Sequence, residues 1–110
     1  MDEPVRFRHD DDGTLDIVLT GAIDSINAQK VGDQLRCKIE ERAPTGVRIN
    51  LSSVTFLDSA GIAVLVLTKR LTRKLDLPFA VYGAGPEVFE HLRMTGLAEL
   101  WDIKPAEPER

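Results

Sequence analysis

Apolar and polar residues alternate in the first part of the chain. The alternation begins in residues 5–8, pauses at the acidic turn 10–13, and returns in residues 15–19 with leucine and isoleucine on one face. Successive side chains of a strand point to opposite faces of a sheet, so this two-residue period predicts two strands joined as a hairpin. We expect the segment 21–25, which starts with glycine, to end the second strand.

The spacing changes to three and four residues after the hairpin. Four apolar residues then share one stripe of a helix: Ala28, Val31, Leu35 and Ile39. This helix is expected to run to about Arg42, because the proline and glycine of segment 44–46 stop it. Asp24 or Ser25 would cap its N-terminus, since a short polar side chain accepts the free backbone N–H groups of a first helical turn.

Strands and helices alternate in the rest of the chain. Residues 47–51 and 79–82 predict short strands, and residues 59–74 predict a helix whose first turns, apolar almost all round, are deeply buried. A third helix starts at Pro86 and ends at 95–97. Because such alternation favours right-handed crossovers, we predict an α/β fold with a mostly parallel central sheet, an N-terminal antiparallel hairpin at its edge and about four helices.

Length and composition favour one domain. The chain has 110 residues, of which 43% are hydrophobic, and this is enough for a single core. We assign the domain to residues 1–103 and expect the proline- and charge-rich segment 104–110 to be a flexible tail. Cys37 is the only cysteine, which excludes an internal disulfide and fits a reducing cytosol.

Charge and hydropathy narrow the classes of function. The net charge of −4 argues against direct nucleic-acid binding, because the phosphate backbone favours a basic surface. No apolar run approaches the roughly 20 residues that span a bilayer, so we expect no membrane insertion and a cytoplasmic location. His9 and His91 fall at predicted surface positions, and we expect neither a metal site nor a cofactor.

The segment 54–61, Val-Thr-Phe-Leu-Asp-Ser-Ala-Gly, carries the main candidate chemistry. It places Ser59 at the N-terminus of a helix, directly after a buried strand. Free backbone N–H groups and the positive end of the helix dipole favour an anion there, including a phosphoryl group on the serine itself. On spacing alone, a simple capping role for Asp58 or Ser59 is the more common arrangement.

Three segments in this order resemble the STAS domain family, named for sulphate transporters and anti-sigma factor antagonists. They are the loop 21–24, the strand-to-helix segment 49–61 and the C-terminal segment 92–97, so the resemblance covers nearly the whole chain. Asn50 stands where many members carry aspartate, and Ala60 where many carry a second serine. Ser59 is therefore the only hydroxyl in its turn.

The resemblance implies a STAS fold and a switchable, non-catalytic binding protein of the anti-sigma factor antagonist type. A cognate anti-sigma factor, a serine kinase of the ATPase-kinase type, would phosphorylate Ser59, and a metal-dependent PP2C-type phosphatase would reverse it. The unmodified form would bind the anti-sigma factor and so free the sigma factor. The implied partner-binding residues are Asp24, Ser25, Asn27, Asp58, Ser59, Ala60 and Gly61.

Elementary topology also brings two of these residues together. Neighbouring parallel strands deliver their following loops to one edge of a sheet, so Asp24 should lie near Asp58. A phosphoryl group on Ser59 adds about −1.5 to −2 charge, which disrupts an interface beside existing carboxylates. An aspartate before a helix is commonly a cap, however, and we give that role of Asp24 equal weight.

Other functional classes fit less well. A hydrolase would need a nucleophile elbow of the Gly-x-Ser-x-Gly type, which the chain lacks. A two-component receiver would need an acidic metal site, but residues 10–12 lie in a hairpin turn. The stronger alternative stays within the family: a constitutive STAS scaffold subunit of a lipid or anion transporter.

Overall fold

The predicted hairpin is present in the computed structural model, which describes residues 3–106. β1 (Val5–His9) pairs antiparallel with β2 (Thr14–Ile23), and Gly13 turns the chain between them with a φ of 90°. Glycine adopts this conformation readily because it has no Cβ to clash with the backbone. The two-residue period therefore places both strands correctly.

The sheet is completed by β3 (Gly46–Leu57) and β4 (Phe79–Tyr82), and its strand order is β1-β2-β3-β4. β3 runs parallel to both of its neighbours. The described residues also form four helices: α1 (Ala28–Arg42), α2 (Ser59–Lys74), α3 (Pro86–Met94) and α4 (Leu97–Leu100). The predicted α/β fold, with its antiparallel edge, is confirmed.

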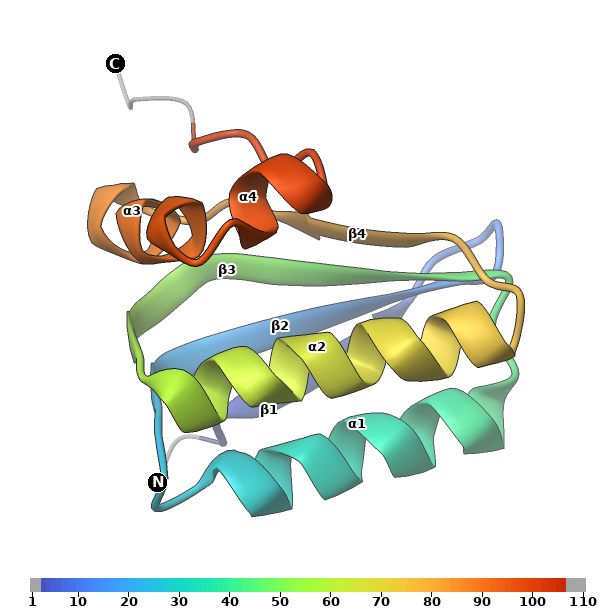
Figure 1. Ribbon diagram of the computed structural model, residues 1–110. Coiled ribbons are helices and arrows are strands. Elements are labelled where there is room, and N and C mark those ends of the chain that lie inside the picture. Colours follow the sequence, from blue (N-terminus) through green and yellow to red (C-terminus); the bar gives the residue numbers. More distant parts are fainter. Residues whose placement is uncertain (1–2, 107–110) are drawn as a thin grey trace.

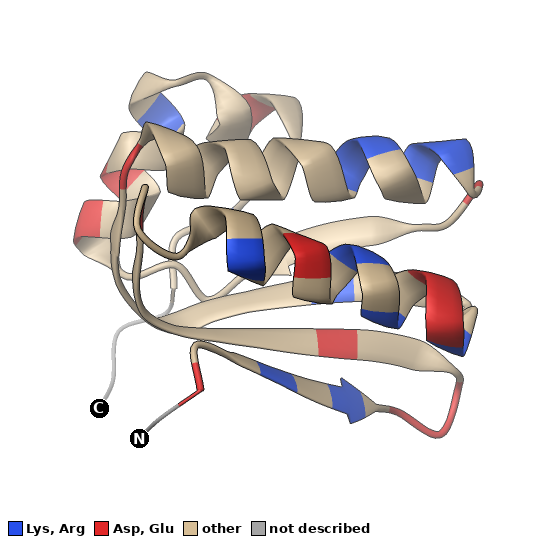
Figure 2. Ribbon diagram, turned by 90° about the horizontal axis from the view of Figure 1, so that it is seen from below, with Lys and Arg blue, Asp and Glu red and all other residues tan. Residues whose placement is uncertain are grey.

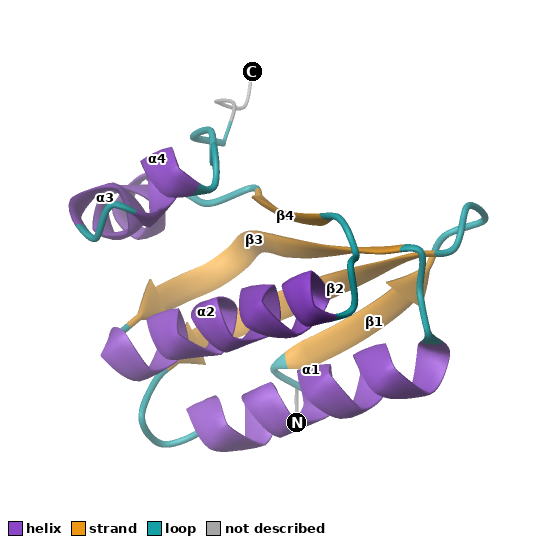
Figure 3. Ribbon diagram, turned by 45° about the vertical axis from the view of Figure 1, so that its right-hand side comes forward, coloured by secondary structure: helices purple, strands orange, loops and turns teal. Residues whose placement is uncertain are grey.

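α1 and α2 lie side by side against one face of the sheet (Figures 1 and 3). The strand residues that face them stand in register across the sheet, as Ile17, Ile49 and Val81 do, and all three are buried. Residues of the intervening rows, such as Asp16 and Arg48, therefore point to the opposite face. The main core fills the space between the sheet and the two helices.

α3 and α4 lie beyond β4 at the edge of the sheet (Figure 1). Trp101 follows α4 and meets Phe79 of β4 edge to face, with ring centroids 5.6 Å apart, and Ile103 is buried. The backbone N–H of Ala106 donates to the carbonyl of Ala84 at 3.1 Å. Part of the predicted tail, residues 107–110, lies outside the described residues.

The segment 21–25 ends β2 as expected, but the strand ends at Ile23 and not at the glycine. Gly21 has a φ of 80° and lies within the strand, where the register with β3 shifts twice. Pairing continues to Ile23, which stands opposite Leu57. The glycine therefore makes an irregularity in the strand instead of ending it, since a longer β3 is present to pair with the residues that follow.

Two expectations about helices also need correction. α1 begins after Asn27, so neither Asp24 nor Ser25 is its N-cap, and the Asn27 side chain makes no capping bond. The first turns of α2 are not buried all round, because Ala63 and Leu67 are exposed. That side of α2 faces away from the sheet, where packing does not reach it.

Candidate functional site

The loops after β2 and β3 leave the sheet at the same end. Ile23 and Leu57 are paired neighbours, and the next residues are Asp24 and Asp58. α1 and α2 both start at this end and run in the same direction (Figure 1). We call residues 24–27, the loop after β2, together with residues 58–61, the N-cap and first residues of α2, the carboxyl edge. The predicted proximity of Asp24 and Asp58 follows from the parallel pairing of the two strands.

Asp58 joins the two segments of the carboxyl edge. It is the N-cap of α2, where its Oδ1 accepts the backbone N–H of Gly61 at 3.0 Å. Its Oδ2 accepts the backbone N–H of Ser25 at 3.1 Å. These bonds, chiefly that from Gly61, lower the pKa of Asp58 below its usual value, so the carboxylate is charged near neutral pH.

The first loop of the carboxyl edge is held by its own side chains. Asp24 Oδ1 accepts the backbone N–H of Ile26 at 3.0 Å. Asn27 Oδ1 accepts the backbone N–H of Asp24 at 3.0 Å, and Asn27 Nδ2 donates to the carbonyl of Ala22 at 2.9 Å. The side chain of Asn27 therefore holds the loop backbone in place through two hydrogen bonds. Asp24 is half-buried, and its Oδ1 is the carboxylate oxygen that bonds within the loop.

Gly61 brings α2 into close contact with the end of β2. A Cβ at this position would lie 2.3 Å from the carbonyl oxygen of Ile23 and 2.9 Å from Leu57 Cδ2. Such an approach is possible for glycine alone, since real Cβ atoms do not come nearer than about 3 Å. Gly61 is therefore a packing residue that fixes where the first turn of α2 stands.

Ser59 is the first residue of α2 and is exposed. None of the hydrogen bonds formed within residues 3–106 uses its hydroxyl, so the oxygen is free to accept a transferred group. The structure adds one feature to the argument from the helix dipole. The N–H of Gly61 already binds Asp58, so a phosphoryl group on Ser59 would meet an ionised carboxylate beside it.

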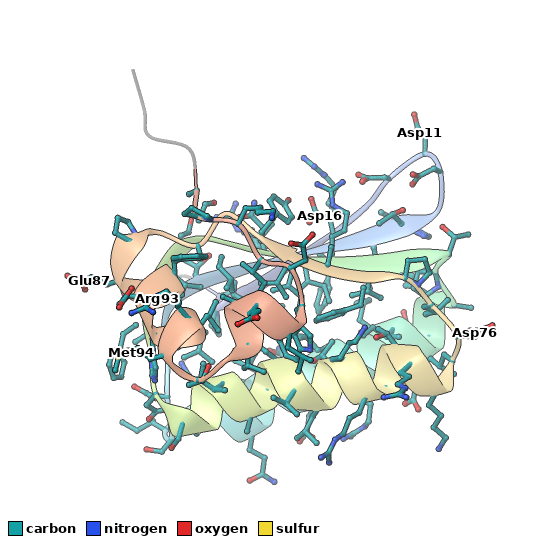
Figure 4. The ribbon with its side chains drawn as sticks, turned by 45° about the horizontal axis from the view of Figure 1, so that its top comes forward. Asp11, Asp16, Asp76, Glu87, Arg93 and Met94 are labelled. Atoms are coloured by element: carbon teal, nitrogen blue, oxygen red, sulfur yellow. The ribbon has the colours of Figure 1, made fainter. Side chains whose placement is uncertain are left out.

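Exposed apolar residues surround the carboxyl edge, and these were missed from the sequence. Ile26 is 92% exposed in the first loop, and Phe56 is 52% exposed two residues before Asp58. Met94, 74% exposed, ends α3 at the end of the molecule where α2 begins (Figure 4). A usable signal was present, since Ile26 lies between polar residues in a loop. Large apolar residues that are exposed near one end of a molecule are typical of an interaction surface.

A second polar cluster lies on the face of the sheet opposite α1 and α2. Asp16 is 1% exposed and accepts the Tyr82 hydroxyl at 3.0 Å and Arg8 Nη2 at 3.1 Å. The Arg48 guanidinium stacks on the Tyr82 ring at 4.7 Å. Burial, and next the bond to Asp16, raise the pKa of Tyr82 above its usual value. The four side chains bond or stack with one another across β1, β2, β3 and β4. We therefore infer that this cluster stabilises the sheet.

Residues 3–106 contain neither a metal-binding cluster nor a membrane-spanning helix. No group of three or more His, Cys, Asp or Glu side chains within residues 3–106 is arranged to hold a metal ion. Over the same residues, every helix is too short or too polar to cross a membrane.

The comparisons with known proteins agree with one another. A family model described as the STAS domain matches residues 8–109. A protein of Listeria monocytogenes, named anti-sigma-B factor antagonist, is 28% identical over 109 residues, which cover 99% of this chain and 95% of that protein. A crystal structure of an anti-sigma factor antagonist from Mycobacterium paratuberculosis is 25% identical with a TM-score of 0.77, over 93% of this chain and 85% of that one.

A further structural likeness concerns the fold alone. The anti-sigma factor antagonist SpoIIAA in its unphosphorylated form is 19% identical to this chain, with a TM-score of 0.78. The match covers 94% of this chain and 88% of that one, so the strands and helices of the two proteins share one arrangement over nearly their full lengths.

Proposed function

Because the chain belongs to the STAS domain family, we propose that it is an anti-sigma factor antagonist switched by phosphorylation of Ser59. In this proposal the unphosphorylated form binds an anti-sigma factor that is also a serine kinase, and so frees a sigma factor. The observation that carries the proposal is the exposed, unbonded Ser59 hydroxyl at the start of α2, beside the ionised Asp58. The names of the relatives support the same role.

The carboxyl edge has the composition of a protein-binding surface. The apolar residues Ile26, Phe56 and Met94 are exposed around it, and water is released when such side chains are covered by a partner. The loop bonds of Asp58 and Asn27 hold the backbone of this surface in one conformation. A preorganised surface binds more tightly, because less conformational entropy is lost on association.

Charge gives the switch its physical basis. Phosphorylation would add about −1.5 to −2 charge to a surface that already carries the carboxylates of Asp24 and Asp58. The pKa of Asp58 is lowered, so this carboxylate stays ionised and repels the new group instead of sharing its proton. A bound partner would have to desolvate this added charge beside the two carboxylates, and each 1.4 kcal/mol of that cost is a tenfold change in affinity.

The two modifying partners follow from the same role. The anti-sigma factor of the ATPase-kinase type would transfer the γ-phosphoryl group of ATP to the Ser59 oxygen, and the hydroxyl proton would leave. A metal-dependent PP2C-type phosphatase would hydrolyse the phosphoserine and restore the binding form. The chain itself would contribute no catalytic group to either reaction.

The test uses the ATPase-type serine kinases encoded in the same genome, purified as a panel. Each is incubated with ATP and the full chain, and the phosphorylated residue is located by mass spectrometry. Binding of wild type, Ser59→Ala and Ser59→Asp is then measured by calorimetry. We expect modification at Ser59 alone, binding by wild type and Ser59→Ala, and at least tenfold weaker binding by Ser59→Asp.

Ser53→Asp supplies a matched control, because Ser53 is an exposed serine of β3 outside the carboxyl edge. It adds the same charge and should bind like wild type. Equal binding by Ser59→Asp and wild type would refute the charge switch. If, in addition, no kinase of the panel phosphorylated Ser59, we would replace this proposal by the alternative, a constitutive scaffold subunit of a transporter.

A further inference from the structure

An apolar groove of about 440 Å³ lies between α1 and α2. Small residues line it on both sides, Ala28 and Gly32 from α1 and Ala60 and Ala63 from α2, and it ends at Leu67 and Leu71. Asp33 and Arg36 of α1 also line it. Leu67 is 59% exposed. The groove is therefore an uncovered apolar surface.

We propose that this groove is the docking site for an amphipathic helix of the anti-sigma factor. The inference rests on the proposed function and extends it by naming the element of the partner and its direction. The groove continues directly from the carboxyl edge, because Ala60 lines it and follows Ser59 in the chain. A partner bound at Ser59 would therefore reach the groove without a gap.

The dimensions suit one helix. The α2 lining spans Ala60 to Leu71, eleven residue steps, which at 1.5 Å each is roughly 16 Å. A partner helix of about three turns covers that length and would present apolar side chains at i, i+3 or i+4, and i+7. The small residues at the mouth of the groove let its backbone approach closely.

The charges around the groove define the direction of the partner helix. The carboxylates of Asp24 and Asp58 stand at the end where the groove begins. Basic residues gather over the C-terminal half of α2: Arg70, Arg73 and Lys74, together with Lys69, whose ammonium lies over the Phe79 ring (Figure 2). The charged residues of α1 that line the groove, Asp33 and Arg36, form an ion pair with each other. The complementary helix is basic at its end over the carboxyl edge and acidic at its other end.

The helix dipoles favour the same direction. α1 and α2 run parallel, so both positive N-terminal ends lie at the carboxyl edge (Figure 1). A third helix is stabilised when it runs antiparallel to them and places its negative C-terminal end there. Basic residues are favoured in the last turn of a helix, in agreement with the charges above.

The experiment uses the kinase from the panel that wild type binds. Ala63→Trp fills the groove and Leu67→Ser removes its exposed apolar side chain, and we expect each to weaken binding at least tenfold. Leu100→Ser is the matched control, because Leu100 is 74% exposed on α4 and lies outside the groove. It should bind within twofold of wild type. Thermal unfolding followed by circular dichroism confirms that each variant is folded.

Cross-linking tests the direction of the helix. A photo-reactive label is attached to the thiol introduced by Lys74→Cys or by Ser25→Cys, each in a Cys37→Ser background because Cys37 is exposed. We expect the first label to react with the N-terminal end of one partner helix, and the second with the C-terminal end of the same helix. The reverse order, or cross-links between two copies of this chain, would overturn the proposal.

The outcomes separate the two proposals. If Ser59→Asp abolishes binding while both groove variants bind like wild type, the groove proposal is wrong and the phosphorylation switch stands. If the groove variants weaken binding and Ser59→Asp does not, the groove is a docking site and the switch is wrong. If wild type binds no kinase of the panel, both proposals fall.

Discussion

Gly61 and Gly32 form a pair of helical glycines for which the structure predicts opposite effects of the same substitution. A Cβ at Gly61 would stand 2.3 Å from the carbonyl oxygen of Ile23, which belongs to the backbone of β2. At Gly32 the nearest atom would be Val64 Cγ2 at 3.8 Å, an ordinary van der Waals contact. The same substitution, glycine to alanine, therefore adds the same methyl group at two helical sites that differ in the space around it.

The magnitudes follow from packing and helix propensity. Alanine stabilises a helix interior by about 1 kcal/mol relative to glycine. Overpacking costs roughly 1–3 kcal/mol, and a clash with strand backbone belongs at the upper end because no flexible side chain can move aside. We expect Gly61→Ala to lower the free energy of unfolding by about 2 kcal/mol, and Gly32→Ala to raise it by up to about 1 kcal/mol.

Urea denaturation and thermal unfolding, both followed by circular dichroism, measure these changes. For a domain of this size about 1 kcal/mol corresponds to roughly 4 °C, so the melting temperature should fall by about 8 °C for Gly61→Ala and rise by up to about 4 °C for Gly32→Ala. If Gly61→Ala were stabilised to the same extent as Gly32→Ala, the close approach of α2 to β2 would be refuted, and with it the geometry of the carboxyl edge.

Two further predictions concern ionisable groups. Hydrogen bonds lower the pKa of Asp58 in the folded state, so its carboxylate stabilises the fold above the unfolded pKa of about 3.8, and this stabilisation is lost as the pH falls through the folded pKa. We measure the free energy of unfolding of wild type and Asp58→Asn in urea at pH 7 and at pH 3. The substitution should destabilise the protein more at pH 7 than at pH 3. Tyr82 is the only tyrosine, so its ultraviolet titration reports one group, whose pKa should lie above 10.0 and move toward 10.0 in Asp16→Asn. The linked stability is present below pH 10 and declines as the pH rises further, and an unshifted titration would exclude the buried bond to Asp16.

Local periodicity was enough to predict most of the fold. The two-residue alternation of β1 and β2 and the stripe on α1 depend on backbone geometry that repeats within a few residues, so both can be recognised without knowledge of what they pack against. The same holds for Pro86 at the start of α3. Ser59 and Asp58 were also within reach, because a polar pair between a strand and a helix is a local pattern.

The parallel pairing of strands also made one non-local contact of the site predictable. Strands that alternate with helices bring successive loops to one edge of the sheet, and this pattern alone predicts that Asp24 lies near Asp58. The individual bonds were not predictable in this way. Asp58 accepts the N–H of Ser25, 33 residues away, and nothing near either residue in the chain specifies the partner.

Tertiary structure alone decided at which residue of the segment 21–25 β2 ends, where α1 begins and which side of α2 stays exposed. β2 continues beyond Gly21 because β3 is long enough to pair with it, and α1 starts late because Asn27 bonds back to Ala22. The exposure of Leu67 and of Ile26 depends on which surfaces the other elements cover. A repeating pattern in the chain determines what each segment tends to become, whereas burial and pairing depend on atoms that come together only in the folded molecule.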